Sequence, residues 1–168
     1  MEINDGFSEV YERNVDSVYR ICLMHLRIVC DAEDATQAVF MKYLKNPRTF
    51  SDCEHEKAWF IVAARNHCRD MLRCWWRAKR SDICEVADKT VSFDTEEDIL
   101  LEKLMALPPK YKEVLYLYYY EGYSVKEISE LIGRNESTIR TQLSVGRGRL
   151  KIELGGYINE RQTHKQGV

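Results

Sequence analysis

The stretch that decides the fold is Tyr123–Leu143, with the sequence YSVKEISELIGRNESTIRTQL. Ser124 and Glu127 have the spacing of a capping box, in which each side chain bonds the other residue's backbone N–H at the start of a helix. Gly133 suits the left-handed turn that ends such a helix, and Asn135 is a typical cap for the next one. The stretch therefore predicts two short helices joined by a tight turn, a unit that usually enters a DNA groove.

The segments around this unit extend it to four helices. One helix is expected over residues 99–107. Another begins near Pro109, because proline suits the first helical turn, and ends at Gly122. The last helix of the unit extends to about Leu154. Residues 99–168 are therefore expected to form one helix-turn-helix domain.

The first half also has the apolar spacing of helices. Residues 15–26 predict an amphipathic helix. A second helix follows, with Asp31 as its N-cap and Asn46, which precedes a proline, as its last residue. After a loop, a longer helix runs over residues 57–77. Residues 1–80 are therefore expected to form a compact helical domain.

Charge is segregated along the chain, although the formal net charge is only −2. Residues 59–80 hold six basic residues against one acidic residue, and residues 134–151 hold five against one. Between them, residues 81–106 hold eight acidic residues against two basic ones. Two basic segments separated by an acidic one predict two contacts with polyanions. Residues 81–98 lack apolar periodicity, so the expected fold is all-α, with two small helical domains joined by an acidic linker.

Several classes of function have no support in the sequence. No apolar run is long enough to span a membrane, and the first residues lack the pattern of a secretory signal, so a cytoplasmic protein without membrane insertion is expected. The six cysteines form no C-x-x-C pair and the four histidines no H-x-x-x-H pair. No phosphate-binding glycine loop occurs either. No metal, cofactor or catalytic site is therefore expected, and the cysteines are interpreted as reduced thiols.

The helix after Gly133 carries the candidate DNA-reading side chains. In a helix-turn-helix the second helix enters the major groove, and its first turns meet base edges. The residues at those positions are Glu136, Ser137, Arg140, Thr141 and Ser144, and nearby candidates for phosphate binding are Arg134, Arg147, Arg149 and Lys151. The alternative is a plain four-helix module with a solvated basic face.

Two glycines, Gly146 and Gly148, lie inside the last helix, and each lowers the stability of the helix by about 0.5–1 kcal/mol relative to alanine. Either the helix end frays there, or its backbone approaches DNA closely.

Three segments, in order, resemble one family. LPPKYKEVLYLYYYEGYSVKEISELIGRNESTIRTQLSVGRGRLK resembles region 4 of bacterial RNA polymerase sigma factors of the extracytoplasmic-function (ECF) group of the sigma-70 family. DAEDATQAVFMKYL and AWFIVAARNHCRDMLRCWWR resemble regions 2.2 and 2.3–2.4 of that group. The resemblance implies an alternative sigma factor that binds the polymerase core, recognises −35 and −10 promoter elements and promotes strand opening. It implies no enzyme activity of its own, since catalysis would belong to the polymerase.

The resemblance also implies particular contacts with partners. The core polymerase would be met through the beta-prime clamp helices and the beta subunit, and the matching residues here are Asp34, Gln37 and Phe40. Ala38 stands where the family usually has an acidic residue. Without the resemblance, the acidic residues here would simply favour the start of a helix. Similar proteins are often held inactive by an anti-sigma partner, and the sequence identifies none.

The two promoter elements would be read by different helices. Asn66 matches the asparagine that reads a base of the −10 element, and an amide suits that role because it both donates and accepts. Arg65, Arg69 and Arg73, with Arg77, repeat every fourth residue and would hold the DNA backbone from one helix face. Trp75 and Trp76 either stack on bases or anchor the helix end. The −35 duplex would be read by Ser137, Arg140, Thr141, Ser144 and Arg147.

The reach of the linker bears on this interpretation. Elements about 25 base pairs apart lie about 85 Å apart at 3.4 Å per pair. A linker of 17 residues spans at most about 55 Å, and a flexible one averages about 23 Å. The polymerase would therefore have to hold the linker extended.

The competing hypothesis is a stand-alone helix-turn-helix regulator whose first half senses a ligand or dimerises. Palindromic half-sites would favour that regulator.

Overall fold

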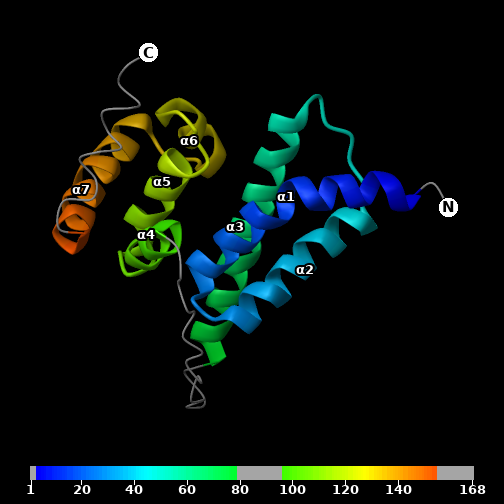
Figure 1. The fold of residues 1–168 in the computed structure, drawn as a ribbon, viewed down its shortest axis with the longest axis horizontal. Helices are drawn as coiled ribbons and strands as arrows, with labels where there is room; N and C mark the ends of the chain where they lie inside the picture. Colours follow the sequence, from blue (N-terminus) through cyan, green and yellow to red (C-terminus); the bar gives the residue numbers. More distant parts are fainter. Residues whose placement is uncertain (1–2, 79–95, 155–168) are drawn as a thin grey trace. The chain divides into compact units, whose positions relative to one another are not determined.

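The structure is a computed structural model that describes residues 3–78 and 96–154. Throughout that part, the secondary structure consists of seven α-helices (Figure 1). The chain divides into two compact units, with α1–α3 in the first and α4–α7 in the second. The prediction of an all-α fold is confirmed. The expected linker lies outside the described residues, except that residues 96–98 form the first turn of α4.

The first unit consists of α1 (Ile3–Leu26), α2 (Val29–Lys45) and α3 (Cys53–Ala78). Figure 1 shows α1 packing along both other helices. The core between them is formed by Val18, Ile21, Met24, Val39, Phe40, Phe60, Ile61 and Ala64, all at most 3% exposed. Burial of these apolar side chains stabilises the unit, at about 25 cal/mol for each Å² removed from water.

Aromatic rings connect the three helices of this unit. The Phe40 ring of α2 lies 4.7 Å from the Tyr11 ring of α1 and 5.0 Å from the Phe60 ring of α3, centroid to centroid. Such tilted ring pairs contribute beyond the area that they bury. All three tryptophans of the chain also lie in α3, at positions 59, 75 and 76.

The starts of α2 and α3 differ from the prediction. Asp31 does not cap α2, because the helix already begins at Val29, and the N-cap position is taken by Ile28 without a side-chain hydrogen bond. Arg27, with φ of 63°, lies in the two-residue turn between α1 and α2, so α2 begins directly after that turn. At α3, the Asp52 carboxylate accepts the His55 N–H at 2.7 Å. This cap starts α3 four residues earlier than predicted.

Two buried polar residues of the first unit, Asn14 of α1 and Glu56 of α3, are paired across helices. The Glu56 carboxylate of α3, in a residue 7% exposed, accepts from Asn14 Nδ2 at 2.7 Å and from Arg13 Nε at 3.2 Å. Cys22 and Cys68, both fully buried, hydrogen-bond to each other, and this contact together with burial raises the pKa of Cys68. The five cysteines within the described residues are free thiols, as expected.

The second unit consists of α4 (Glu96–Met105), α5 (Pro109–Tyr119), α6 (Val125–Ile132) and α7 (Glu136–Leu154). The prediction of four helices is confirmed. Helix α5 is packed by the other three, so residues 111–117 are all buried. It ends at Tyr119, earlier than predicted, and Gly122 takes a φ of 77° in the turn that follows. That turn is closed by a hydrogen bond from the Tyr123 N–H to the Leu117 carbonyl at 3.0 Å.

Candidate nucleic-acid interface

The turn that presents α7 is built as the sequence predicts. The Ser124 N–H donates to Glu127 Oε2 at 2.8 Å, and the Glu127 N–H donates to Ser124 Oγ at 3.3 Å. Gly133 ends α6 in the left-handed conformation, with φ of 66°. The hydrogen bond from Ser124 N–H holds the pKa of the Glu127 carboxyl below its ordinary value. The capping box and the glycine turn are therefore confirmed.

Helix α7 separates a buried face from an exposed one. Ile139, Leu143 and Leu150 are buried against the rest of the unit, at most 5% exposed. On the outer side lie the exposed candidates Ser137, Arg140, Thr141 and Ser144. These four recur every three or four residues, so they form one row along the helix. Because Ser137 stands in the first turn, the row begins at the end of α7 that a helix-turn-helix directs at base edges.

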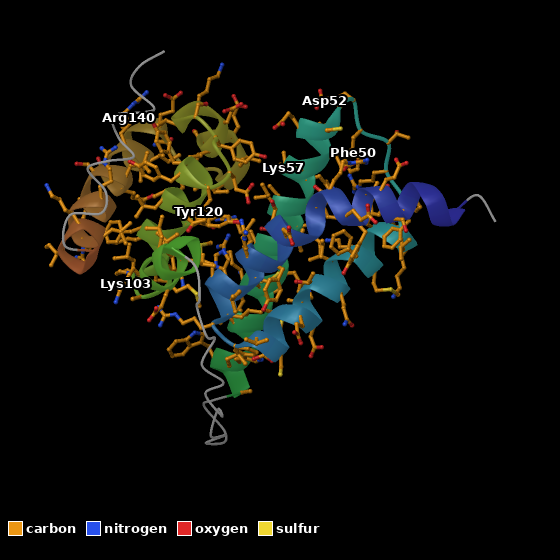
Figure 2. The ribbon with its side chains drawn as sticks, viewed as in Figure 1. Phe50, Asp52, Lys57, Lys103, Tyr120 and Arg140 are labelled. Atoms are coloured by element: carbon orange, nitrogen blue, oxygen red, sulfur yellow. The ribbon has the colours of Figure 1, made fainter. Side chains whose placement is uncertain are left out.

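Arg140 is the longest side chain of this row and is held by an acidic neighbour. Its Nη2 donates to Glu136 Oε2 at 2.8 Å, one turn earlier on α7. The Arg140 side chain is 63% exposed, and Figure 2 shows it on the outer side of the helix. An exposed pair of this kind is weak, so a stronger acceptor can displace Glu136.

The basic residues around α7 do not all face solvent. Arg147 is half-buried and donates to the Tyr119 hydroxyl at 3.4 Å. The exposed Arg149 places its guanidinium 5.0 Å from the centre of the Tyr111 ring. Arg134, a candidate for phosphate binding on charge alone, instead pairs with Glu113 at 2.9 Å. A groove of about 350 Å³ lies along the exposed row of α7, lined by Lys110, Tyr111, Ser137, Thr138, Thr141, Gln142 and Val145.

The two glycines of α7 differ in their surroundings. The helix continues through both to Leu154, so neither ends it. Gly146 is buried against α5, where a Cβ would come within 3.2 Å of the Tyr111 Cβ, whereas Gly148 faces open space. Gly146 is therefore required by close packing of α5 and α7, which neither sequence-based alternative included.

The predicted polymerase-binding residues of α2 lie in different environments. Asp34 and Gln37 are exposed on the outer face of the helix. Phe40 is only 3% exposed, because its ring packs in the aromatic core, so it supports α2 from within and is not a surface contact. Met41 and Leu44, which sequence reasoning missed, are 50% and 37% exposed. Their signal is the spacing: positions 34, 37, 41 and 44 follow a three-four repeat on one face.

The arginines of α3 do not form the single face that was predicted. Arg65 is only 7% exposed, whereas Arg69 and Arg73 are exposed, and Arg73 pairs with Asp70 at 3.6 Å. The cause is helical geometry: with 3.6 residues per turn, each four-residue step rotates about 40° further round the axis. Asn66, next to Arg65, is exposed. Of the two neighbouring tryptophans, position 75 is half-buried and position 76 is 74% exposed.

Both units match descriptions of one protein family. Residues 10–78 match "Sigma-70 region 2", and residues 97–150 match "Sigma-70, region 4". The chain belongs to the sigma-70 family. The two matches together include all of α2, α3, α5 and α6 and nearly all of α4.

Named relatives place this sigma factor in the ECF group. RNA polymerase sigma factor SigV of Bacillus subtilis is 29% identical over 143 residues, covering 81% of this chain and 83% of that protein. ECF RNA polymerase sigma factor SigW of the same organism is 27% identical, covering 89% of each. SigM of Mycobacterium tuberculosis is 27% identical, covering 92% of this chain and 79% of that protein. The chain is therefore an alternative sigma factor, which directs RNA polymerase to promoters.

A solved structure shares the fold of the sigma factor. The sigma factor RpoE from Bartonella quintana, solved in complex with the anti-sigma factor NepR, superposes with a TM-score of 0.73 at 21% identity. The superposition covers 90% of this chain and 98% of that one. Among residues 3–78 and 96–154, no helix has the length and apolarity to cross a membrane. The same residues hold no group of three or more side chains suited to a metal ion.

Proposed function

We propose that this sigma factor holds the core polymerase with α2 and contacts promoter DNA with α3 and α7. The observation that carries the proposal is the exposed row of α7, Ser137, Arg140, Thr141 and Ser144, which lies opposite the buried Ile139 and Leu143. A row of hydroxyl and guanidinium groups at the start of such a helix supplies both donors and acceptors for base edges. Arg147 would add a phosphate contact by exchanging its weak bond to the Tyr119 hydroxyl.

The −10 element would be met by the exposed side of α3. Asn66, Arg69 and Arg73 are exposed there, and Trp76 stands at the same end of the helix as Arg73. An amide reads a base edge, arginines hold the backbone, and an exposed indole provides a stacking surface for an unpaired base. The buried Arg65 is left out of this surface, since its guanidinium is not available without repacking.

The polymerase would be met by the stripe of α2 formed by Asp34, Gln37, Met41 and Leu44. Its two ends differ in chemistry: the first two residues are polar, and the last two are apolar and exposed. Exposed apolar side chains in a regular stripe mark a surface that a partner covers. A three-four repeat is also the spacing that packs against another helix, which fits the clamp helices of the beta-prime subunit.

Regulation and location follow from the same assignment. Catalysis would remain with the polymerase, and the chain would act in the cytoplasm, where the polymerase works. Because RpoE of Bartonella quintana was solved with an anti-sigma factor, a protein that covers these faces is a reasonable partner for this chain too. Such a partner would compete with the polymerase for the α2 stripe.

The test is transcription with purified components. Bacterial core polymerase is incubated with sheared genomic DNA, with and without the protein, and the 5′ ends of the RNA are mapped. The expected result is a set of starts that need the protein and share two upstream elements. Absence of new starts and of core binding, together with tight binding of the free protein to palindromic duplex DNA, would support the stand-alone regulator instead.

A further inference from the structure

Arg134 lies in the turn between α6 and α7 and connects three parts of the second unit. Its Nη2 donates to Glu113 Oε2 of α5 at 2.9 Å, and its Nη1 donates to Gln142 Oε1 of α7 at 3.2 Å. Its backbone carbonyl accepts from the Ser129 hydroxyl of α6 at 2.6 Å. Arg134 therefore bonds to α5, α6 and α7, although Glu113 lies 21 residues before it and Gln142 eight residues after it.

The bridge from Glu113 through Arg134 to Gln142 is shielded from water at its Glu113 end. The Glu113 side chain is only 5% exposed, and that of Arg134 is 29% exposed. A carboxylate this deeply buried is stabilised by cationic donors, and removing one costs far more than breaking a surface pair. A guanidinium is rigid and planar, so two bonds from its two ends fix the directions of both partners. The bridge therefore constrains how α7 lies on α5.

Gln142 lies within the part of α7 that carries the exposed row of Ser137, Arg140, Thr141 and Ser144. It follows Thr141 directly and lies five residues after Ser137. A rotation of α7 about its axis would move Arg140 and Thr141 sideways relative to the DNA groove. Since α7 is a continuous helix over these positions, fixing Gln142 fixes the direction in which the whole row points.

We propose that Arg134 is a positioning residue for −35 recognition, which acts through Glu113 and Gln142 and does not bind phosphate. The inference rests on the proposed function of α7. Charge alone places Arg134 among the phosphate contacts, and its geometry separates it from them. Loss of a phosphate contact weakens binding about equally for all sequences and lowers the salt dependence. Loss of positioning changes the preference among sequences.

The test uses full-length protein, core polymerase and a promoter library randomised over the −35 segment, with RNA output as the readout. Wild type is expected to prefer its best segment over singly substituted ones by roughly 5- to 150-fold. Arg134→Ala is expected to reduce that ratio by about 2- to 30-fold, the range for residues that act without touching the ligand. Arg134→Lys is expected to fail to rescue, because a lysine point charge does not replace a two-ended fork.

Controls separate positioning from DNA contact and from unfolding. Arg147→Ala, a candidate phosphate contact, is expected to lower output on all segments alike. Gln142→Ala keeps the buried ion pair, so the unit stays folded, and it is expected to reduce the same ratio. The double variant R134A/Q142A is expected to be no worse than Arg134→Ala alone, because both changes break one bridge.

Three results would overturn the inference. The first is an equal loss on every segment for Arg134→Ala, with a salt slope lowered by about one, which is the behaviour of a phosphate contact. The second is an unchanged preference for Gln142→Ala. The third is additive effects in the double variant. A wild-type protein without any −35 preference would instead refute the proposed function itself, and the inference with it.

Discussion

Gly146 of α7 lies so close to Leu115 of α5 that an added methyl group would come within 2.9 Å of the Leu115 Cδ1. Real side chains do not tolerate that separation, so a larger residue must push α7 away or force Leu115 into another rotamer. Leu115 is 1% exposed and has little room to move. The close approach of the two helices therefore depends on this glycine.

Gly146→Ala is expected to destabilise the second unit. Overpacking a filled core costs about 1–3 kcal/mol, which outweighs the gain of about 0.5–1 kcal/mol from replacing a helical glycine. Gly148→Ala is the matched control: it lies in the same helix and faces open space, so only the gain applies. Urea unfolding of the two variants measures both effects. Stabilisation by Gly146→Ala would show that α5 and α7 are not in close contact.

The α2 stripe predicts which substitutions weaken core binding. Asp34→Ala combined with Gln37→Ala is expected to lower the affinity for core polymerase without unfolding the first unit, since both residues are exposed. Met41→Ala is expected to add to that loss, by more than about 1 kcal/mol if it is a central contact. Lys42→Ala, exposed but off the stripe, is the control. Binding titrations with core polymerase measure the difference, and equal affinities would place the interface elsewhere.

Arg140 is expected to determine preference at particular base pairs. Arg140→Ala should weaken use of some −35 sequences by about 1–3 kcal/mol for a lost bidentate contact and leave others little changed. Glu136→Gln is expected to have the opposite sign, because it replaces the competing carboxylate, which accepts from Arg140 at 2.8 Å, with a weaker neutral acceptor and removes a negative charge near DNA. Transcription from a panel of −35 variants measures both. A uniform loss for Arg140→Ala would assign it to phosphate binding.

The capping box makes the stability of α6 depend on pH. The bond from Ser124 N–H lowers the pKa of Glu127 in the folded state below its ordinary value of 4.5. The stabilisation is therefore fully present above pH 4.5 and is lost as pH falls through the lower folded pKa. Ser124→Ala is expected to cost about 0.5–2 kcal/mol at neutral pH. Glu127→Gln is expected to make the melting temperature fall less steeply as the pH drops below 4.5. An unchanged pH dependence would show that the bond between Ser124 and Glu127 does not contribute to it.

Local signals in the sequence predicted most of the fold. The Ser124–Glu127 pair and Gly133 act through bonds within a few residues, so their spacing alone identified the helix-turn-helix. The exposed position of Ser137, Arg140, Thr141 and Ser144 followed from the same local geometry, once Ile139 and Leu143 were taken as the buried side. These signals act between residues close in sequence and do not depend on distant contacts, so the structure agrees with them.

The remaining features depend on contacts between distant residues. Asp31 has the chemistry of a cap, but α2 begins two residues before it, directly after the turn at Arg27. Arg65 belongs to a regular four-residue repeat, yet helical rotation carries it to the buried side. The partner of Arg134 is Glu113, which no periodicity connects to it. For Gly146, the need arises from Leu115, and a glycine in a helix looks like a defect until its neighbour is known.

The confinement of tryptophan to α3 gives the protein two separate optical signals. All three indoles lie in the first unit, whereas six of the ten tyrosines lie in the described part of the second, so selectively excited indole emission reports on α1–α3 alone. The exposed Trp76 would emit like an indole in water, and docking of a base or a polymerase surface on it would shift or quench that emission. Engagement of the first unit can thus be followed in real time in the unlabelled protein.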